Sequence, residues 1–255
     1  MPINCHFHNY MLWSMHDKPN QEKEGFSVIK FMTVVYGFDI YQKHIEVYCR
    51  IIPNRTSVKT LALFDFDGTI TTHDTMLDPA CFSAGKFRYI LTMIVISPVL
   101  LLMKLKLISN SFTKELFMSV FFGGMNEQAF VQLCNAYNKK RLPELIRPRA
   151  LAQIQSHLEH GDDVYVVSAS ATHWLQPWCN QQQLSLICSQ LEIVDRKLTG
   201  KLDGPNCNGE EKVRRIQQAI NLSLYDKIIA YGDSSGDKEM FAISHEHYFK
   251  PFRNE

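Results

Sequence analysis

The strongest constraint on the fold of this chain is the run 61–69, where four apolar residues lead into Asp65-Phe-Asp67-Gly68-Thr69. A short apolar run of this kind favours a buried β-strand. Successive strand side chains point to opposite faces, so Asp65 and Asp67 share a face and repel each other unless a cation binds between them. Gly68 allows a sharp turn and a close approach of the backbone to a ligand. Asp and Gly also favour ordinary surface turns, so this motif alone leaves that simpler interpretation open.

Two later segments place a hydroxyl and a lysine at the ends of predicted elements. Residues 163–170 are an apolar, β-rich run that ends in hydroxyls, which predicts a buried parallel strand with Ser168 at its carboxyl end. Residues 209–216 predict a helix start, with acids in the first turn and Lys212 just inside it. Taken singly, Ser168 is more often a cap or turn residue, and Lys212 a solvated helix cation.

A third segment, 227–237, again follows an apolar run with two acids. The apolar half predicts another strand, and the turn after it carries Asp233 and Asp237. Each of these motifs lies where a strand meets a loop or a helix, and that edge of an open α/β sheet is where ligands bind. The order acid pair, hydroxyl, lysine and acid pair is hard to produce by chance, so the motifs together predict one shared site.

With these motifs the chain resembles the haloacid dehalogenase-like hydrolases, subfamily IB, the branch that contains phosphoserine phosphatase and bacterial phosphatidylglycerophosphatase C. The resemblance covers about residues 59–252 and extends to the segments 202–212 and 248–251. It implies an α/β fold with a Rossmann-like, mainly parallel sheet and an inserted α-helical cap of the C1 type. It also implies a Mg²⁺-dependent phosphomonoesterase whose partner is a phosphate-ester substrate.

The resemblance implies a role for each motif residue. Asp65 is expected to be the nucleophile that forms an aspartyl-phosphate, and Asp67 the general acid and base. The phosphoryl group is expected to be held by donors from three motifs: Gly68, Thr69, Ser168 and Lys212. The Mg²⁺ ligands are expected to be Asp65, the backbone carbonyl of Asp67 and Asp233, while Asp237 is expected either to bind the ion or to orient the groups around it.

Asp74 lies nine residues after Asp65, where phosphoserine phosphatases carry a glutamate that helps to select the substrate. An acid here is expected to contact a substrate amine or hydroxyl, or to orient the entry loop. A plain loop residue before the Asp78-Pro79 turn fits the sequence equally well. The shorter side chain counts against phosphoserine, so a phospholipid-headgroup or glycerol-type phosphate is the leading expectation. Phosphoserine or another small metabolite is the alternative.

Three other classes stay open. The first is a catalytically idle protein that binds a phosphorylated ligand or a membrane. The second is a phosphotransferase or mutase, which would pass the same aspartyl-phosphate to an alcohol. The third is a Ser-His-Asp hydrolase around Ser168, Ser170 and His173, although a Gly-x-Ser-x-Gly sequence is missing.

Length and composition set outer limits. A chain of 255 residues has room for one α/β domain with an insertion, and its net charge of +1 gives no reason to expect a nucleic-acid partner. Residues 75–147 contain nine Lys/Arg and four Asp/Glu, a local charge of +5 that suits an anionic substrate, an anionic membrane surface or a solvated face. The seven cysteines lack Cys-x-x-Cys spacing, which predicts reduced thiols and a cytoplasmic location.

The chain divides by composition into three parts. Residues 1–57 are expected to be an N-terminal extension of unknown role, with natural translation from Val58 as one hypothesis. Residues 58–74 and 148–255 are expected to form the catalytic core, and 75–147 the helical cap. The helices expected in the cap cover 84–97, 99–107, 113–121 and 126–139.

Residues 89–103 are fifteen positions without a charge, followed by Lys104 and Lys106. The run is shorter than the roughly twenty residues of a membrane span, and Pro98 is expected to interrupt it. Either a buried pair of cap helices or an apolar hairpin that dips into a bilayer fits this pattern. In the second case 89–107 would hold the protein at the cytoplasmic face of the inner membrane. The oligomeric state is left open.

Overall fold

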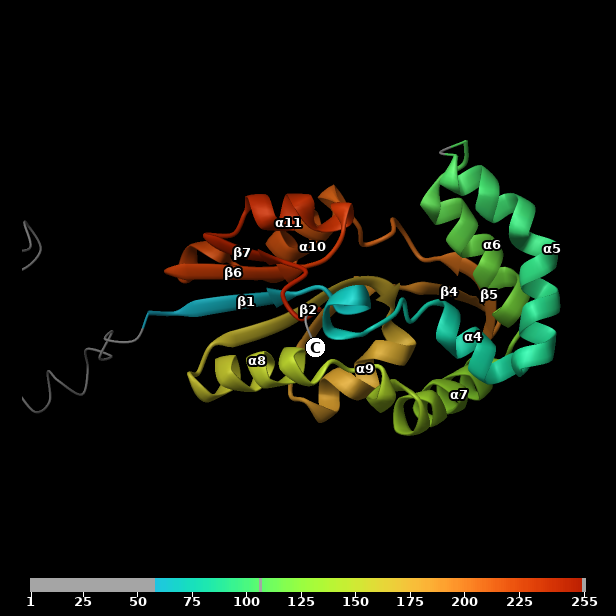
Figure 1. Ribbon diagram of the computed structural model, residues 1–255, viewed down its shortest axis with the longest axis horizontal. Coiled ribbons are helices and arrows are strands. Elements are labelled where there is room, and N and C mark those ends of the chain that lie inside the picture. Colours follow the sequence, from blue (N-terminus) through green and yellow to red (C-terminus); the bar gives the residue numbers. More distant parts are fainter. Residues whose placement is uncertain (1–57, 106, 254–255) are drawn as a thin grey trace, which may run out of the picture. The chain divides into compact units, whose positions relative to one another are not determined.

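The computed structural model describes residues 58–105 and 107–253, so the expectation for residues 1–57 lies outside the described part. The described chain is built on a parallel sheet with the strand order β3-β2-β1-β6-β7 (Figure 1). The sheet strands are β1 (Thr60–Phe64), β2 (Asp163–Ala171), β3 (Ser185–Ser189), β6 (Lys227–Gly232) and β7 (Glu246–Phe249). This is the predicted α/β, Rossmann-like fold.

The central strand β1 is buried along its whole length. Its side chains alternate between two apolar layers, as the period of a strand requires. Ala62 and Phe64 pack toward α8 (Pro148–Glu159) and α9 (Thr172–Gln181). On the other face, Leu61 and Leu63 pack toward α10 (Glu210–Ala219) and α11 (Lys238–Ala242). Helices on both faces explain why β1 is a continuous apolar run.

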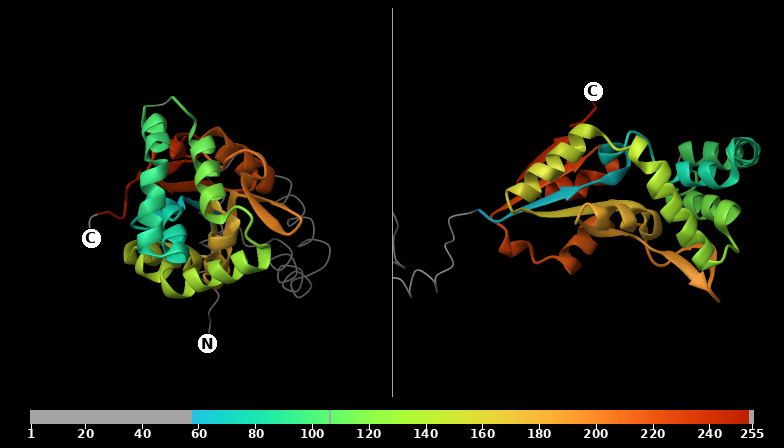
Figure 2. Two further views of the ribbon diagram at one scale, coloured as in Figure 1. Left: turned by 90° about the vertical axis from the view of Figure 1, so that its right-hand side faces the viewer. Right: turned by 90° about the horizontal axis from the view of Figure 1, so that it is seen from below.

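Four helices lie between β1 and α8 in the sequence and beyond the carboxyl ends of the strands in space (Figures 1 and 2). They are α4 (Leu77–Ala84), α5 (Lys86–Lys104), α6 (Asn110–Phe122) and α7 (Glu127–Lys140). We call α4 to α7 the helical insertion. They fall inside the range 75–147, and their role as a cap stays a prediction.

A β-hairpin is formed by β4 (Leu191–Val194) and β5 (Lys197–Leu202), and it packs against the helical insertion. Gly200 of β5 has φ +85°, and a Cβ there would overlap the backbone of Ser119 on α6. The Leu202 backbone N–H donates to Glu115 Oε1 of α6 at 3.1 Å. A glycine at residue 200 therefore lets the hairpin and α6 touch.

The expectation of a break at Pro98 was wrong, because α5 is one helix of 19 residues with Pro98 inside it. Proline cannot donate a backbone hydrogen bond to the carbonyl four residues earlier. Here Ser97 Oγ donates to that carbonyl, Ile94 O, at 2.7 Å. A side chain thus replaces the missing backbone donor. The expected Asp78-Pro79 turn was also wrong: both residues lie in the first turn of α4, where proline is tolerated.

Candidate functional site

Asp65 stands at the carboxyl end of β1, with its backbone N–H donating to Tyr231 O of β6 at 2.8 Å. Its side chain is almost completely buried. One carboxylate oxygen, Oδ1, accepts from Lys212 Nζ at 2.6 Å, and Oδ2 accepts from Thr69 Oγ1 at 3.3 Å. Burial raises the pKa of Asp65 to about 8, although the Lys212 ammonium opposes this shift. A bound cation would favour the ionised carboxylate.

Lys212 lies in the first turn of α10, where Gly209 precedes the helix with φ +60°. The ammonium is 2 % exposed and donates to both Asp65 Oδ1 and Asp237 Oδ1 at 2.6 Å. Burial alone would lower the pKa of Lys212, but the two carboxylates raise it. Lys212 is therefore a permanent positive charge between two acids.

Asp237 and Asp233 come from the turn after β6. The completely buried Asp237 uses Oδ2 to accept from the backbone N–H groups of Asp233 at 3.2 Å and Ser234 at 3.0 Å. These bonds fix the turn and leave Oδ1 for Lys212. Asp233 is paired with Arg253, near the end of the described chain.

Three of the predicted ligands gather at one point. Asp65, Asp233 and Asp237 each offer a carboxylate oxygen, and these oxygens lie within 4.8 Å of one another. Oxygen donors of this charge suit Mg²⁺, and the three acids fit such an ion. The Asp67 carboxylate belongs to a different group of contacts, so any contribution of this residue would come from its backbone, as predicted.

The Asp67 carboxylate is held by four hydrogen bonds. Its Oδ1 accepts from the Thr75 backbone N–H and from Thr75 Oγ1, both at 2.6 Å. Its Oδ2 accepts from Ser168 Oγ at 3.2 Å and from Ser170 Oγ at 2.7 Å. These donors are neutral, so Asp67 is oriented by three hydroxyls and one backbone N–H, whereas Asp65 is bound by a cation.

Four residues of this neighbourhood were not predicted for the phosphatase site from the sequence: Thr75, Lys114, Ser170 and Arg253. Ser170 was named only for the Ser-His-Asp alternative. Ser170 had a signal, because it lies two positions after Ser168 on the same strand and shares its face. The other three had none, since each reaches the site through tertiary contacts between distant segments.

Lys114 reaches the core from α6 of the helical insertion. It is 7 % exposed, and its Nζ donates to the Ala169 carbonyl and to Asn206 Oδ1, the latter at 3.1 Å. Burial lowers the pKa of Lys114, and the nearby carboxylates of Asp67 and Asp74 work against that shift. A buried cation from the insertion therefore stands beside the acids of the core.

Asp74 is exposed, and its Oδ1 accepts from the Met76 backbone N–H at 2.8 Å. Desolvation by the surrounding protein, followed by repulsion from Asp67, raises the pKa of Asp74 to about 6. Asp74 is thus close enough to Asp67 for the charge of that carboxylate to affect its pKa. Its role in substrate selection stays a prediction.

The alternative Ser-His-Asp arrangement finds no support in the described contacts. The hydroxyls of Ser168 and Ser170 both donate to Asp67. The His173 ring packs edge-on against Phe130, with ring centroids 5.4 Å apart, and its Nδ1 has no protein partner among the described residues.

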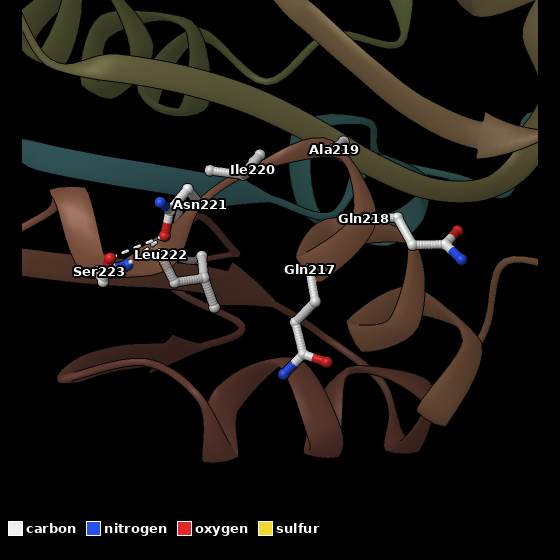
Figure 3. A pocket seen from close by; sticks show the side chains of 7 residues that line it. All are labelled: Gln217, Gln218, Ala219, Ile220, Asn221, Leu222 and Ser223. Atoms are coloured by element: carbon white, nitrogen blue, oxygen red, sulfur yellow. Dashed lines mark hydrogen bonds between the residues drawn. The ribbon is translucent and has the colours of Figure 1, made fainter.

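A shallow, open pocket lies at the far end of α10, lined by Gln217–Ser223 (Figure 3). Lys212 is in the first turn of α10, whereas this pocket begins in its last turn, before β6 starts. The pocket therefore lies at the amino edge of the sheet, opposite to the acids. Asn221 Oδ1 is already bonded to Ser223 there, and the pocket adds nothing to the site.

Comparison with known proteins agrees with this geometry. A sequence model of the haloacid dehalogenase-like hydrolases matches residues 62–242. The chain belongs to this family. The matched range begins in β1 and ends in α11, so it includes Asp65, Asp67, Ser168, Lys212, Asp233 and Asp237.

Individual relatives are more distant. Protein CicA of Caulobacter vibrioides is 29 % identical over 199 residues, which are 76 % of this chain and 86 % of CicA. A protein of unknown function from Bordetella pertussis Tohama I has a similar structure, with a TM-score of 0.67 and 18 % identity over 75 % of this chain and 89 % of that one. A phosphoserine phosphatase, solved as a phospho-aspartyl intermediate analogue, has a TM-score of 0.51 and 23 % identity over 75 % of this chain and 86 % of that one. These likenesses establish a shared fold.

Proposed function

We propose that this hydrolase is a Mg²⁺-dependent phosphomonoesterase that works through an aspartyl-phosphate on Asp65. The observation that supports the proposal is that two neighbouring acids have different contacts. Asp65 contacts the Lys212 cation and lies with two further carboxylates, whereas Asp67 is held by neutral hydroxyls. These contacts support Asp65 as the nucleophile, beside a positive charge, and Asp67 as the residue that exchanges a proton.

The chemistry follows from these contacts. A phosphate ester and a carboxylate repel each other, and a bound Mg²⁺ supplies the positive charge that offsets this repulsion. An Asp65 oxygen attacks phosphorus, and the bond from phosphorus to the leaving oxygen breaks. Lys212 and the Ser168 hydroxyl stabilise negative charge on the remaining phosphoryl oxygens.

Asp67 moves the protons in this scheme. It gives a proton to the leaving oxygen, and then takes one from the water that hydrolyses the aspartyl-phosphate. Each hydroxyl of Thr75, Ser168 and Ser170 has one hydrogen to donate and two acceptor lone pairs, so each can donate to the ionised carboxylate and accept from the protonated acid. Asp67 therefore keeps its orientation in both protonation states.

The substrate we propose is a phospholipid-headgroup or glycerol-type phosphate. The short Asp74 side chain suits contact with a hydroxyl, and the buried Lys114 adds positive charge for an anionic substrate. The alternative, phosphoserine or another small metabolite, is favoured by the same pair of charges. An acid and a cation near each other would suit the ammonium and the carboxylate of such a substrate.

The test is phosphate release from a panel of esters by the purified chain, with Mg²⁺ and with a chelator. We expect turnover that needs Mg²⁺ and that Asp65→Asn abolishes. Binding of phosphate esters without turnover would instead favour the idle, ligand-binding class. Transfer of phosphate to added glycerol in preference to water would favour a phosphotransferase. Turnover by Asp65→Asn near the wild-type rate would exclude the covalent route.

A further inference from the structure

The outer face of α5 is apolar and exposed to solvent. Phe87, Ile94, Val95 and Leu101 are 78 %, 62 %, 77 % and 58 % exposed. The same surface continues past the helix to Leu107, which is 68 % exposed. Contiguous exposed apolar side chains are uncommon on a soluble monomer and mark an interaction surface.

The inner face of α5 already has a partner. Tyr89, Met93 and Leu100 pack against the main core, and Ile96 is the one fully buried residue of the helix. The helix is therefore apolar on all sides, while only one side is covered by the described part of the chain. A helix with this pattern is normally surrounded by apolar material.

The charges on α5 itself are all of one sign. From Pro79 to Lys114 the sequence contains no Asp or Glu. Three of its five cations, Lys86, Arg88 and Lys104, lie in α5, and Lys106 and Lys114 follow it in the sequence. The apolar face therefore has positive charge on its own helix, and its natural complement is a surface that combines apolar material with negative charge.

The fold shows how α5 can meet a bilayer. Among the described helices, α5 alone is long and apolar enough to cross one. A single crossing between β1 and β2 would put these strands on opposite sides of the membrane, yet they pair directly, from Leu61↔Asp163 to Phe64↔Val166. The helix must therefore lie along the surface, with its inner face still on the protein.

We propose that the outer face of α5 docks this protein on an anionic lipid bilayer. The exposed apolar side chains enter the boundary between headgroups and acyl chains, while Lys86, Arg88 and Lys104 meet lipid phosphates. A second copy of the chain is a poorer occupant, because an α5-to-α5 contact would bring together two helices that carry cations and no acids.

The docking face is at the functional end of the molecule. Strands β1 and β6 point their carboxyl ends, which carry the site acids, toward the helical insertion, and α5 is its outermost helix in Figure 1. In the left view of Figure 2, α5 and α6 stand in front of the sheet. A docked molecule would therefore hold the site near the lipid headgroups. The docking itself does not depend on the proposed function.

The test is co-flotation of the full chain with vesicles of phosphatidylglycerol and phosphatidylcholine, against vesicles of phosphatidylcholine alone. We expect flotation with the anionic vesicles that weakens with salt. The pair Val95→Ser and Leu101→Ser should reduce binding about tenfold or more. The matched pair Val194→Ser and Leu224→Ser, at residues that are each 52 % exposed on other elements, should bind as wild type does.

A second pair tests the charges independently of the apolar contacts. Lys86→Gln with Lys104→Gln should weaken binding to anionic vesicles, whereas Lys140→Gln with Lys201→Gln, two exposed lysines elsewhere, should not. Asp65→Asn should float like the wild type, which separates docking from hydrolysis.

Two results would overturn the proposal. One is a wild-type chain that does not bind anionic vesicles. This includes the case in which light scattering shows a dimer of the wild type and the pair Val95→Ser and Leu101→Ser dissociates it. The other is equal flotation of the α5 pair and its matched control.

Discussion

The backbone of Gly68 lies directly against the carboxylate of Asp233. Gly68 has φ +76°, and a Cβ on it would stand 2.9 Å from Asp233 Cγ, closer than real Cβ contacts allow. The turn after β1 and the turn after β6 are thus fitted to each other around the acid cluster. Glycine at residue 68 is required both by its backbone angle and by this contact.

Gly68→Ala should therefore damage the site. We expect about a tenfold or greater loss of kcat/KM, because the new Cβ displaces Asp233 from the cluster. Gly161→Ala is the matched control, since Gly161 has φ +78° and a Cβ there meets nothing within 4 Å. Both variants should lose about 1 kcal/mol of unfolding free energy from the left-handed backbone. Equal activity of the two variants would show that the Asp233 contact is unimportant.

Removal of a metal ligand should remove stabilisation by the metal. A ligand that binds only the folded state at about 100 times its Kd adds about 2.7 kcal/mol to the free energy of unfolding. We expect Mg²⁺ to raise the melting temperature of the wild type, and Asp233→Asn to lose most of that rise. Asp195→Asn, a change at an exposed hairpin acid, should keep it. Calorimetry with and without Mg²⁺ measures both.

Lys114→Met should weaken substrate binding more than it slows the chemical step. The methionine keeps the apolar stem and removes the buried charge beside Asp67 and Asp74. For an anionic substrate we expect KM to rise about tenfold, equal to about 1.4 kcal/mol, with a smaller change in kcat. Lys201→Met, at an exposed lysine of β5, is the control. An unchanged KM across the ester panel would contradict a contact with substrate.

Asp74→Asn should change the pH dependence of stability. The pKa of Asp74 is about 6 in the folded protein and about 3.9 in an unfolded chain. Between these values the folded wild type binds more protons than the unfolded chain, so its free energy of unfolding falls as pH rises. The variant keeps the oxygen that accepts from Met76 and lacks this titration.

The free energy of unfolding of Asp74→Asn should therefore equal that of the wild type near pH 4 and be larger above pH 7. Because Asp74 is exposed, solvent screening limits the difference to about 1 kcal/mol. Urea unfolding at several pH values measures it. A constant difference across that range would mean that the pKa of Asp74 is not raised.

Ser170→Ala should slow the reaction through Asp67. The Ser170 hydroxyl makes the shorter of the two serine bonds to Asp67 Oδ2. Loss of one such bond to a charged group is worth about 1.5–3 kcal/mol, so we expect kcat to fall about tenfold to a hundredfold. Mg²⁺ affinity should stay unchanged, because the metal cluster is formed by other carboxylates. Ser170→Thr, which retains a hydroxyl, should recover part of the rate.

The local sequence was enough to predict the elements that carry the site. The apolar run before Asp65, the hydroxyls after 163–167 and the acids after 227–232 each mark the end of a strand, because strand periodicity and turn chemistry depend on neighbours in the chain. The parallel order of these strands follows from the helices between them. Asp65, Ser168, Lys212 and the two later acids could therefore be assigned to one edge of the sheet in advance.

Only the tertiary structure decided which groups touch. Asp233 pairs with Arg253, Lys114 reaches the core from the helical insertion, and Thr75 donates to Asp67. No local sequence pattern predicts that these residues meet. The same is true of α5. Its apolar sequence was compatible with a buried helix or a lipid-facing one, and its exposure depends on how the helical insertion packs. Periodicity shows that a face is apolar, but burial is decided by the surfaces that other segments bring to it.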